Sequence, residues 1–276
     1  MKSLVLLLIT CILVLTTASP LRSETEGPPT WMKNITRLPP GDHVNLRPVH
    51  LDYTLAWNNR VNAGELEVSI DRTDDGNSQF VGDATGRSTG FARVLWPYDF
   101  RARSLVDGMS LRPIVFQLRE KERNEESSYD IIFESNSQVY TTTSREEGEE
   151  ARTATNRFHF DFGQDVLSSA FYLRSHSLDA GDEINMVVTP FNKPYLARFT
   201  VTGREERKIK GTRYKTIKLD AKVGKVNPDL SIKTYEKIKK TTLWVSDDEY
   251  RIPLELQSDL IFGFVSARLD DLEWLD

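Results

Sequence analysis

Apolar and polar residues alternate in short runs along most of the chain after residue 50. In residues 51–57 every second residue is Leu, Tyr or Trp, and in residues 66–70 it is Leu, Val or Ile. A period of two is typical of strands with one buried face. Similar runs predict further strands near residues 80–84, 100–106, 112–119, 128–134, 138–143, 184–189, 197–202, 214–223, 241–245, 252–257 and 261–269.

Residues 165–174 differ, because their apolar residues recur at steps of three and four. Val166, Ala170 and Leu173 share one face, which predicts the principal helix of the protein. Asp165 can cap the start of this helix, and Arg174 lies in the last turn, where the helix dipole favours a cation. We therefore expect Asp165 and Arg174 to be structural. The helix either closes one end of the sheet or gates a ligand cavity, and the sequence leaves both open.

The predicted sheet is too large for this helix to cover. About thirteen strands of about five residues present an apolar face of about 1,000 Å², and a ten-residue helix covers about a seventh of it. The fold class is therefore mainly β, with a large, strongly curved antiparallel sheet that forms a half-barrel or open barrel; a sandwich is the alternative. A curved sheet leaves room for a small apolar ligand. The residues expected to line this cavity are Leu55, Trp57, Val68, Ile70 and Phe171.

The first 18 residues have the pattern of a secretory signal peptide. Lys2 precedes the apolar run 4–15, and the small residues 16–18 follow it. Residues 19–46 are rich in proline and predict an extended arm, and residues 47–276 predict a single β-domain. No later run approaches the ~20 apolar residues of a membrane span. We expect an exported protein that does not span the membrane, located in the periplasm if the source is Gram-negative.

Composition excludes several kinds of site. The formal net charge of −5 makes nucleic acid an unexpected partner, and the single cysteine, Cys11, lies in the predicted leader. The four histidines lack metal-ligand spacing, so they are expected at the surface. Asp247, Asp248 and Glu249 lie between two predicted strands and indicate a hairpin turn. No metal site and no cofactor are expected.

The segment 86–90 reads Gly-Arg-Ser-Thr-Gly, a literal G-x-S-x-G. In hydrolases this motif places a serine on a sharp turn between a strand and a helix. Here the following segment, 91–100, is aromatic and interrupted by Pro97, so we expect it to be non-helical and Ser88 to lie in a glycine-rich turn. Trp96, Tyr98 and Phe100 share one face of a strand as core residues or, alternatively, as cavity lining.

Four stretches together resemble the bacterial exported family catalogued as domain of unknown function 3108. They are YTLAWNNRVNAGEL (53–66), the helix 165–174 with the downstream Gly181, LWVSDDEYRIP (243–253) and FGFVSARL (262–269). The resemblance implies a relative of the periplasmic lipoprotein-carrier and lipid-carrier folds, in which a curved antiparallel sheet wraps an apolar cavity. It implies no catalytic residue.

The sequence thus favours an exported, non-enzymatic protein that binds a lipid or a lipoprotein acyl chain in the cavity of its sheet. The alternative is an interaction or scaffold protein of the cell envelope with a closed core, which meets an envelope protein through its sheet edges or through the basic segment 233–240. A hydrolase that uses Ser88 is a distant third hypothesis.

Overall fold

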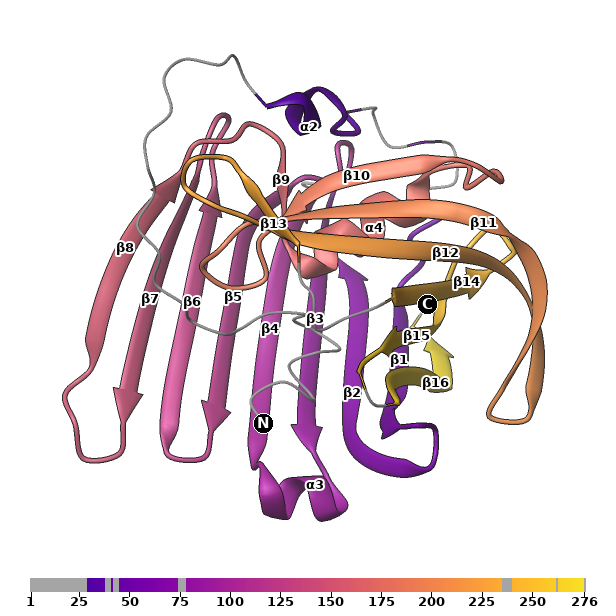
Figure 1. Ribbon diagram of the computed structural model, residues 1–276, viewed down its shortest axis with the longest axis horizontal. Coiled ribbons are helices and arrows are strands. Elements are labelled where there is room, and N and C mark those ends of the chain that lie inside the picture. Colours follow the sequence, from indigo (N-terminus) through magenta and orange to yellow (C-terminus); the bar gives the residue numbers. More distant parts are fainter. Residues whose placement is uncertain are drawn as a thin grey trace.

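A computed structural model describes residues 29–37, 41, 45–73, 78–234, 240–261 and 263–275. In this part of the chain, sixteen strands form one sheet and three helices accompany it (Figure 1). The helices are α2 (Thr30–Lys33), α3 (Gly90–Leu95) and α4 (Val166–Ser175). The strands are β1 (Val49–Trp57), β2 (Val61–Arg72), β3 (Gln79–Ser88), β4 (Tyr98–Asp107), β5 (Pro113–Glu122), β6 (Glu125–Phe133), β7 (Gln138–Glu146), β8 (Arg152–Phe158), β9 (Gly163–Gln164), β10 (Glu183–Val188), β11 (Tyr195–Ile209), β12 (Thr212–Val226), β13 (Ile232–Thr234), β14 (Lys240–Ser246), β15 (Pro253–Asp259) and β16 (Phe264–Trp274).

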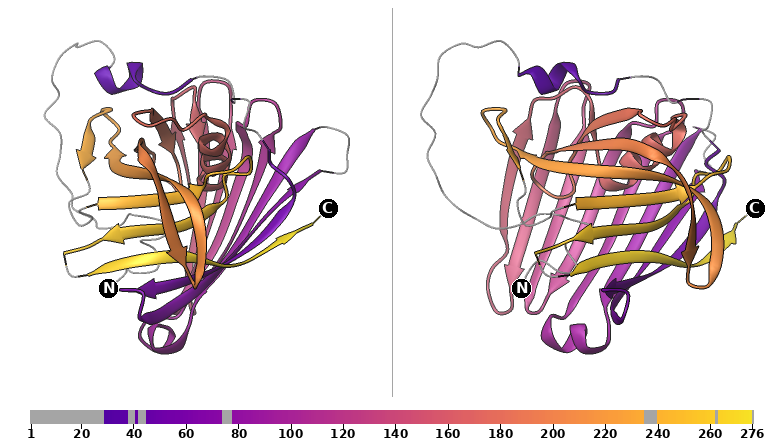
Figure 2. Two further views of the ribbon diagram at one scale, coloured as in Figure 1. Left: turned by 90° about the vertical axis from the view of Figure 1, so that its right-hand side faces the viewer. Right: turned by 45° about the vertical axis from the view of Figure 1, so that its right-hand side comes forward.

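The sheet is continuous, open and strongly curved. Its strand order is β8-β7-β6-β5-β4-β3-β2-β1-β16-β15-β14-β12-β11-β10-β9, and β13 pairs with β12. All neighbouring strands are antiparallel except β9 and β10, which pair in parallel over two residue pairs. Figure 2 shows how the halves β1–β8 and β10–β16 face each other as two walls. The predicted fold class is confirmed, and because a single sheet makes both walls, the sandwich alternative is wrong.

Helix α4 is the only helix longer than six residues in the described part of the chain, and it lies between the two walls (Figures 1 and 2). It packs against β3 and β4 on one side and β10 on the other. Gly82 of β3 allows a close approach, since a Cβ atom there would lie 3.1 Å from Phe171 Cζ and 3.3 Å from Leu167 Cδ1. Buried residues of α4 belong to both apolar clusters of the core, so the helix joins the two walls.

Two short helices lie where the sequence predicts none. Helix α2 lies within the predicted extended arm 19–46, of which the structure describes 29–37, 41 and 45–46. Trp31 Nε1 donates to the Leu230 carbonyl at 2.9 Å, and the Thr36 N–H donates to the Asn185 carbonyl of β10 at 2.9 Å. Ile35 and Leu46 are buried. This part of the arm therefore packs on the domain; the predicted signal peptide lies outside the described residues.

The second short helix, α3, corrects the expectation that residues 91–100 are non-helical. Its six residues precede Pro97, so the proline ends the helix without interrupting it. None of the helices in the described residues has both the length and the apolar character that crossing a bilayer requires.

The long hairpin β11–β12 bends so that its far end contacts β14 and β15. The bend follows a bulge between Val201 and Gly203, where Gly203 adopts a φ of 143° that other residues rarely adopt. Beyond it, Arg207 lies over the ring of Trp244 at 3.9 Å, and its Nε donates to Glu255 Oε2 at 2.8 Å. Glu255 is only 2% exposed. The tip of the hairpin thus covers a buried carboxylate.

Candidate functional site: an apolar cavity under α4

The start of α4 is fixed by a buried carboxylate. Asp165 is 0% exposed and occupies the N-cap, where its Oδ1 accepts from the N–H groups of Leu167 at 2.7 Å and Ser168 at 2.9 Å. Ser168 Oγ accepts from the Asp165 N–H in return, which completes a capping box. Ser104 of β4 donates to Asp165 Oδ2 at 2.6 Å and ties the helix to the sheet. Burial raises the pKa of Asp165, although these hydrogen bonds oppose the shift.

The end of α4 is fixed by a buried guanidinium. Arg174 is 2% exposed, and its Nε and Nη2 donate to the Tyr250 carbonyl at 3.0 and 2.6 Å. Tyr250 lies in the turn between β14 and β15, so this contact joins the helix to the second wall. Burial lowers the pKa of Arg174 to about 10, against the opposing effects of Tyr53 and Asp248. Arg174 therefore keeps its charge at neutral pH.

A cavity of about 350 Å³ lies between α4 and the inner face of the sheet. Ligand pockets of proteins commonly have volumes of about 300–1,000 Å³ and mostly apolar linings. From α4, seven residues line the cavity, namely Val166, Leu167, Ser169, Ala170, Phe171, Leu173 and Arg174. Three of these residues are only half-buried, unlike most of the helix, because they border the open space. Both walls of the sheet contribute lining residues, among them Leu51, Leu66, Val68, Ile70, Phe100, Val188, Phe199, Val223, Leu243 and Leu256.

Small side chains make room for the cavity. Ala84 of β3 and Ala102 of β4 are register partners, and both line the cavity. The opposite wall contributes three more alanines to the lining, Ala197, Ala221 and Ala267. Inward-facing positions of a β-sheet usually carry larger apolar side chains that fill the core. The alanines leave the space under α4 unfilled.

Three of the five predicted lining residues, Val68, Ile70 and Phe171, line the cavity. Leu55 and Trp57 do not. Leu55 is 0% exposed in the apolar cluster around Phe116, and its Cδ1 lies 3.2 Å from the position of a Cβ on Gly64. Trp57 pairs with Val61 at the end of the β1–β2 hairpin, beyond a bulge at residues 55/56. The last residues of β1, 55–57, therefore do not line the cavity.

The aromatic run after the glycine-rich segment is core. Trp96, Tyr98 and Phe100 are all buried, and the rings of Trp96 and Tyr98 stack at 4.8 Å. Phe100 also lines the cavity, so the alternative prediction, that these aromatic residues are cavity lining, applies to Phe100.

Ser88 lies between a strand and a short helix, as in hydrolases, but its hydroxyl is used internally. Ser88 is 2% exposed; its Oγ accepts from the Tyr98 N–H at 3.0 Å and donates to the Tyr98 carbonyl at 3.4 Å. A buried hydroxyl held in this way cannot attack a substrate. The geometry thus gives no support to the hydrolase hypothesis.

The histidines differ from their predicted surface positions in one case. His176 is 8% exposed and packs edge-on against Tyr172 at 4.7 Å, and burial lowers its pKa. His50 and His159 are partly or fully exposed, and His43 lies outside the described residues. In the described part of the chain, no group of three His, Cys, Asp or Glu residues is placed to hold a metal ion.

The residues 247–249 form the predicted turn, in which Asp248 Oδ1 accepts from Ser246 Oγ at 2.7 Å.

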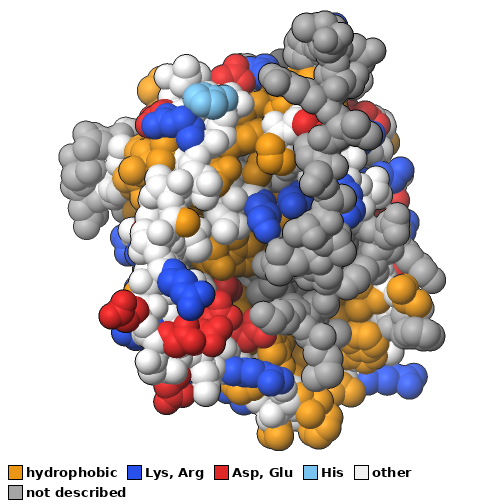
Figure 3. Space-filling view, turned by 60° about the vertical axis from the view of Figure 1, so that its left-hand side comes forward, with side chains coloured by type: hydrophobic (Ala, Val, Ile, Leu, Met, Phe, Trp, Pro, Cys, Tyr) orange, Lys and Arg blue, Asp and Glu red, His pale blue; other side chains and the backbone are white. Residues whose placement is uncertain are grey.

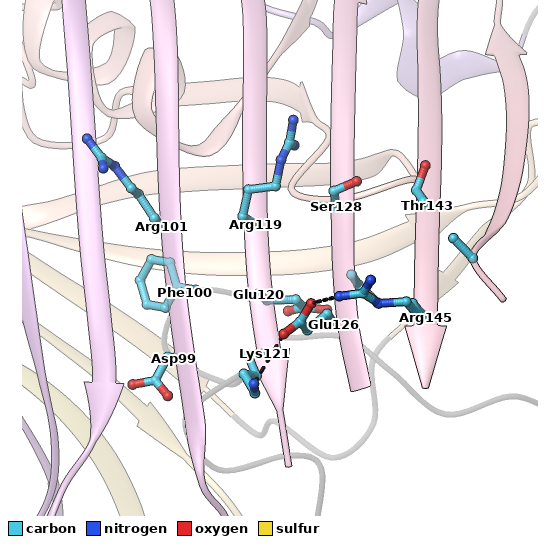
Figure 4. A pocket seen from close by; sticks show the side chains of 12 residues that line it. Asp99, Phe100, Arg101, Arg119, Glu120, Lys121, Glu126, Ser128, Thr143 and Arg145 are labelled. Atoms are coloured by element: carbon cyan, nitrogen blue, oxygen red, sulfur yellow. Dashed lines mark hydrogen bonds and ion pairs between the residues drawn. The ribbon is translucent and has the colours of Figure 1, made fainter. Parts of the chain in front are cut away.

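A larger but polar groove of about 620 Å³ crosses β4–β7 (Figure 4). Three of its charged side chains pair with one another: Glu126 accepts from Lys121 Nζ at 3.1 Å and from Arg145 Nη2 at 2.7 Å. In the space-filling view from the β8 side, acidic and basic side chains are mixed with apolar ones (Figure 3). This groove offers no concentrated charge or apolar surface to a ligand, so the cavity under α4 is the better candidate.

Glu120, at the edge of this groove, is a partly buried carboxylate with two phenol partners. Tyr98 donates to its Oε2 at 2.7 Å and Tyr129 to its Oε1 at 3.0 Å. Burial raises the pKa of Glu120 more than these hydrogen bonds lower it. Because the folded pKa lies above the unfolded value of about 4.3, the folded state binds the proton more tightly in that pH range.

This linkage predicts the behaviour of Glu120→Gln. The wild-type protein should gain stability from Glu120 as the pH falls from 7 through the folded pKa, and the variant should lack this gain. Urea unfolding of both proteins at pH 7.5, 6.0 and 5.0 measures this gain. The free energy of unfolding of the variant, minus that of the wild type, should be highest at pH 7.5 and should fall as the pH is lowered. Parallel pH profiles for the two proteins would show that Glu120 does not titrate differently on folding.

The fold and the cavity define the class: an open, half-barrel β-protein with a helix packed inside it over an apolar cavity. The chain belongs to the family DUF3108, described as protein of unknown function, which matches residues 52–270. The family resemblance predicted from the sequence motifs is thereby confirmed. No curated protein matches the chain in sequence.

A solved structure with a TM-score above 0.5 shares this fold. A beta-barrel-like protein of the DUF1849 family from Brucella abortus is 10% identical, with a TM-score of 0.54 over 84% of this chain and 99% of that one. A Bacteroides fragilis protein with a YmcC-like fold, inferred to be exported, is 8% identical, with a TM-score of 0.33 over 83% and 97% of the two chains. An inferred lipoprotein from Parabacteroides distasonis is 6% identical, with a TM-score of 0.34 over 82% and 95%. Neither the family description nor that of the Brucella protein names an enzymatic activity.

Proposed function

We propose that this chain is an exported, non-enzymatic protein that binds an apolar ligand, such as a lipid or acyl chain, in the cavity under α4. The observation that carries the proposal is the cavity itself, about 350 Å³ of space lined mostly by apolar side chains from α4 and both walls. Export rests on the leader pattern of residues 1–18.

The cavity is part of the architecture, since small residues border it on several strands while large residues fill the rest of the core. An empty apolar space of this size forfeits dispersion contacts along its whole lining and destabilises the fold. An apolar ligand would restore those contacts.

Ala170→Trp tests the proposal by filling the cavity from the helix. Ala170 is half-buried and lines the cavity, and a larger side chain there can extend into space that is already present. Phe171 is unsuitable, because it is 1% exposed and packs on Gly82, so a polar replacement would unfold the protein. We expect Ala170→Trp to weaken binding at least tenfold, about 1.4 kcal/mol.

The measurement is fluorescence titration with N-phenyl-1-naphthylamine, an uncharged apolar probe. The matched control is Ala154→Phe, an equally apolar enlargement on the exposed strand β8. The wild type and the control should bind the probe equally. Exclusion of the probe by the wild type, or equal binding by Ala170→Trp, would remove the cavity as a ligand site.

A second candidate is an interaction protein of the cell envelope. One observation favours it: on α3 the side chains of Phe91, Val94 and Leu95 are 68, 78 and 44% exposed. Apolar side chains grouped in this way often mark a contact surface. A Phe91→Ser, Val94→Ser variant should lose a protein partner in cross-linking while it still binds the apolar probe. The basic segment 233–240 lies largely outside the described residues.

A further inference from the structure

Arg174 and Glu255 are the two charged residues among those that line the cavity, and Glu255 is paired with Arg207 at 2.8 Å. Of the five N–H donors of Arg174, two are used by the Tyr250 carbonyl, through Nε and Nη2. Among the described residues, Nη1 has no hydrogen-bond acceptor, and no carboxylate lies within 4.0 Å of the guanidinium. Both N–H groups of Nη1 and the second N–H group of Nη2 therefore have no acceptor among the described residues, although Arg174 is 2% exposed.

The neighbouring polar groups are already used. Asp248, the acidic residue whose charge reaches Arg174, accepts through Oδ1 from Ser246 Oγ and from the N–H groups of Tyr250 and Arg251, so it stabilises its own turn. The hydroxyl of Tyr53, another lining residue, donates to the Pro253 carbonyl at 2.8 Å. The carbonyl end of the α4 dipole compensates part of the charge. None of these groups neutralises the guanidinium.

We infer that the ligand is a long-chain carboxylate whose headgroup binds the free Nη1/Nη2 end of Arg174 while its chain occupies the apolar cavity. The inference rests on the proposed function and names its ligand class. A buried cation without a counter-ion is strongly destabilising unless something pairs with it, and the planar guanidinium binds carboxylates through two parallel hydrogen bonds. The lining supplies the rest of the match, since most of its side chains are apolar.

The test is displacement of N-phenyl-1-naphthylamine from the full mature chain by sodium palmitate or by 1-hexadecanol, both below their aggregation concentrations. We expect the wild type to bind palmitate at least tenfold more tightly than hexadecanol. Arg174→Met should lose this preference by weakening palmitate binding about tenfold, on the scale of one charge-assisted hydrogen bond. Arg101→Met, which removes an exposed arginine of β4, should behave as the wild type.

The outcomes separate the two proposals. If palmitate and hexadecanol bind the wild type equally, the carboxylate site is wrong and the apolar cavity stands; if neither displaces the probe and the probe itself does not bind, the proposed function fails. If Arg174→Met does not fold, the preference of the wild type for palmitate over hexadecanol decides whether the ligand is a carboxylate. If Arg174→Met folds and keeps this preference, the assignment of Arg174 as the carboxylate site is wrong.

Discussion

Arg207→Met is expected to lower the free energy of unfolding by about 3 kcal/mol. The substitution removes the partner of Glu255, which is 2% exposed and whose Oε1 already has no hydrogen-bond partner. Breaking a buried ion pair from one side typically costs about 3–5 kcal/mol. We expect a value at the lower end of this range because the Arg207 side chain is 29% exposed, so water can replace part of its interaction with Glu255. Loss of the contact with Trp244 adds to the cost.

Chemical denaturation of the single and double variants measures this effect. Arg207→Met combined with Glu255→Met should recover most of the loss, because no charge then remains buried. The matched control is Arg213→Met on the same hairpin, whose partner Glu206 is 3.9 Å away and exposed, so its stability should stay within about 0.5 kcal/mol of the wild type. Equal stabilities for Arg207→Met and Arg213→Met would show that the hairpin tip does not protect a buried carboxylate.

Asp165→Ala should lower the free energy of unfolding by about 2–4 kcal/mol. The lost N-cap accounts for about 1 kcal/mol. The sequence predicts that loss alone, but the structure adds Ser104, whose buried hydroxyl would lose its acceptor at a cost of about 1–3 kcal/mol. The helix also joins both walls of the sheet, so its loosening affects the whole domain.

Asp165→Asn is the control, because its amide oxygen can still accept from the N–H groups of Leu167 and Ser168. It should remain within about 1 kcal/mol of the wild type. Thermal and urea unfolding of the three proteins measure the difference. An Asp165→Ala variant as stable as Asp165→Asn would contradict the cap.

The sequence predicts the sheet and its principal helix because both have strong periodicity. Ile217 and Leu219, for example, alternate with charged residues and are 0% exposed in β12. Strand β8 gives no such signal, since six of its seven residues are exposed at the end of the sheet. Helix α3 has apolar residues, but they face solvent. Their spacing therefore does not show the period of a helix with one buried face, and the sequence does not predict this helix.

The candidate site is less predictable because a cavity depends on which side chains are small. Alternation places Val68 and Ile70 on the inner face, but it cannot show that bulges redirect the end of β1 and move Trp57 away. Alanines at inward positions, such as Ala84 and Ala102, are the signal that sequence reasoning could have used. The isolation of Arg174 is invisible in sequence, because it depends on the turn between β14 and β15 that Asp248 stabilises.

Native mass spectrometry of the mature protein, purified from the exported fraction without detergent, tests the ligand-binding cavity most directly. The wild type should carry a bound species of lipid mass that solvent extraction recovers, and Ala170→Trp should carry much less of it at equal yield. A wild-type protein that is ligand-free under these conditions, remains so after incubation with palmitate or hexadecanol, and has the same mass spectrum as Ala170→Trp would contradict it.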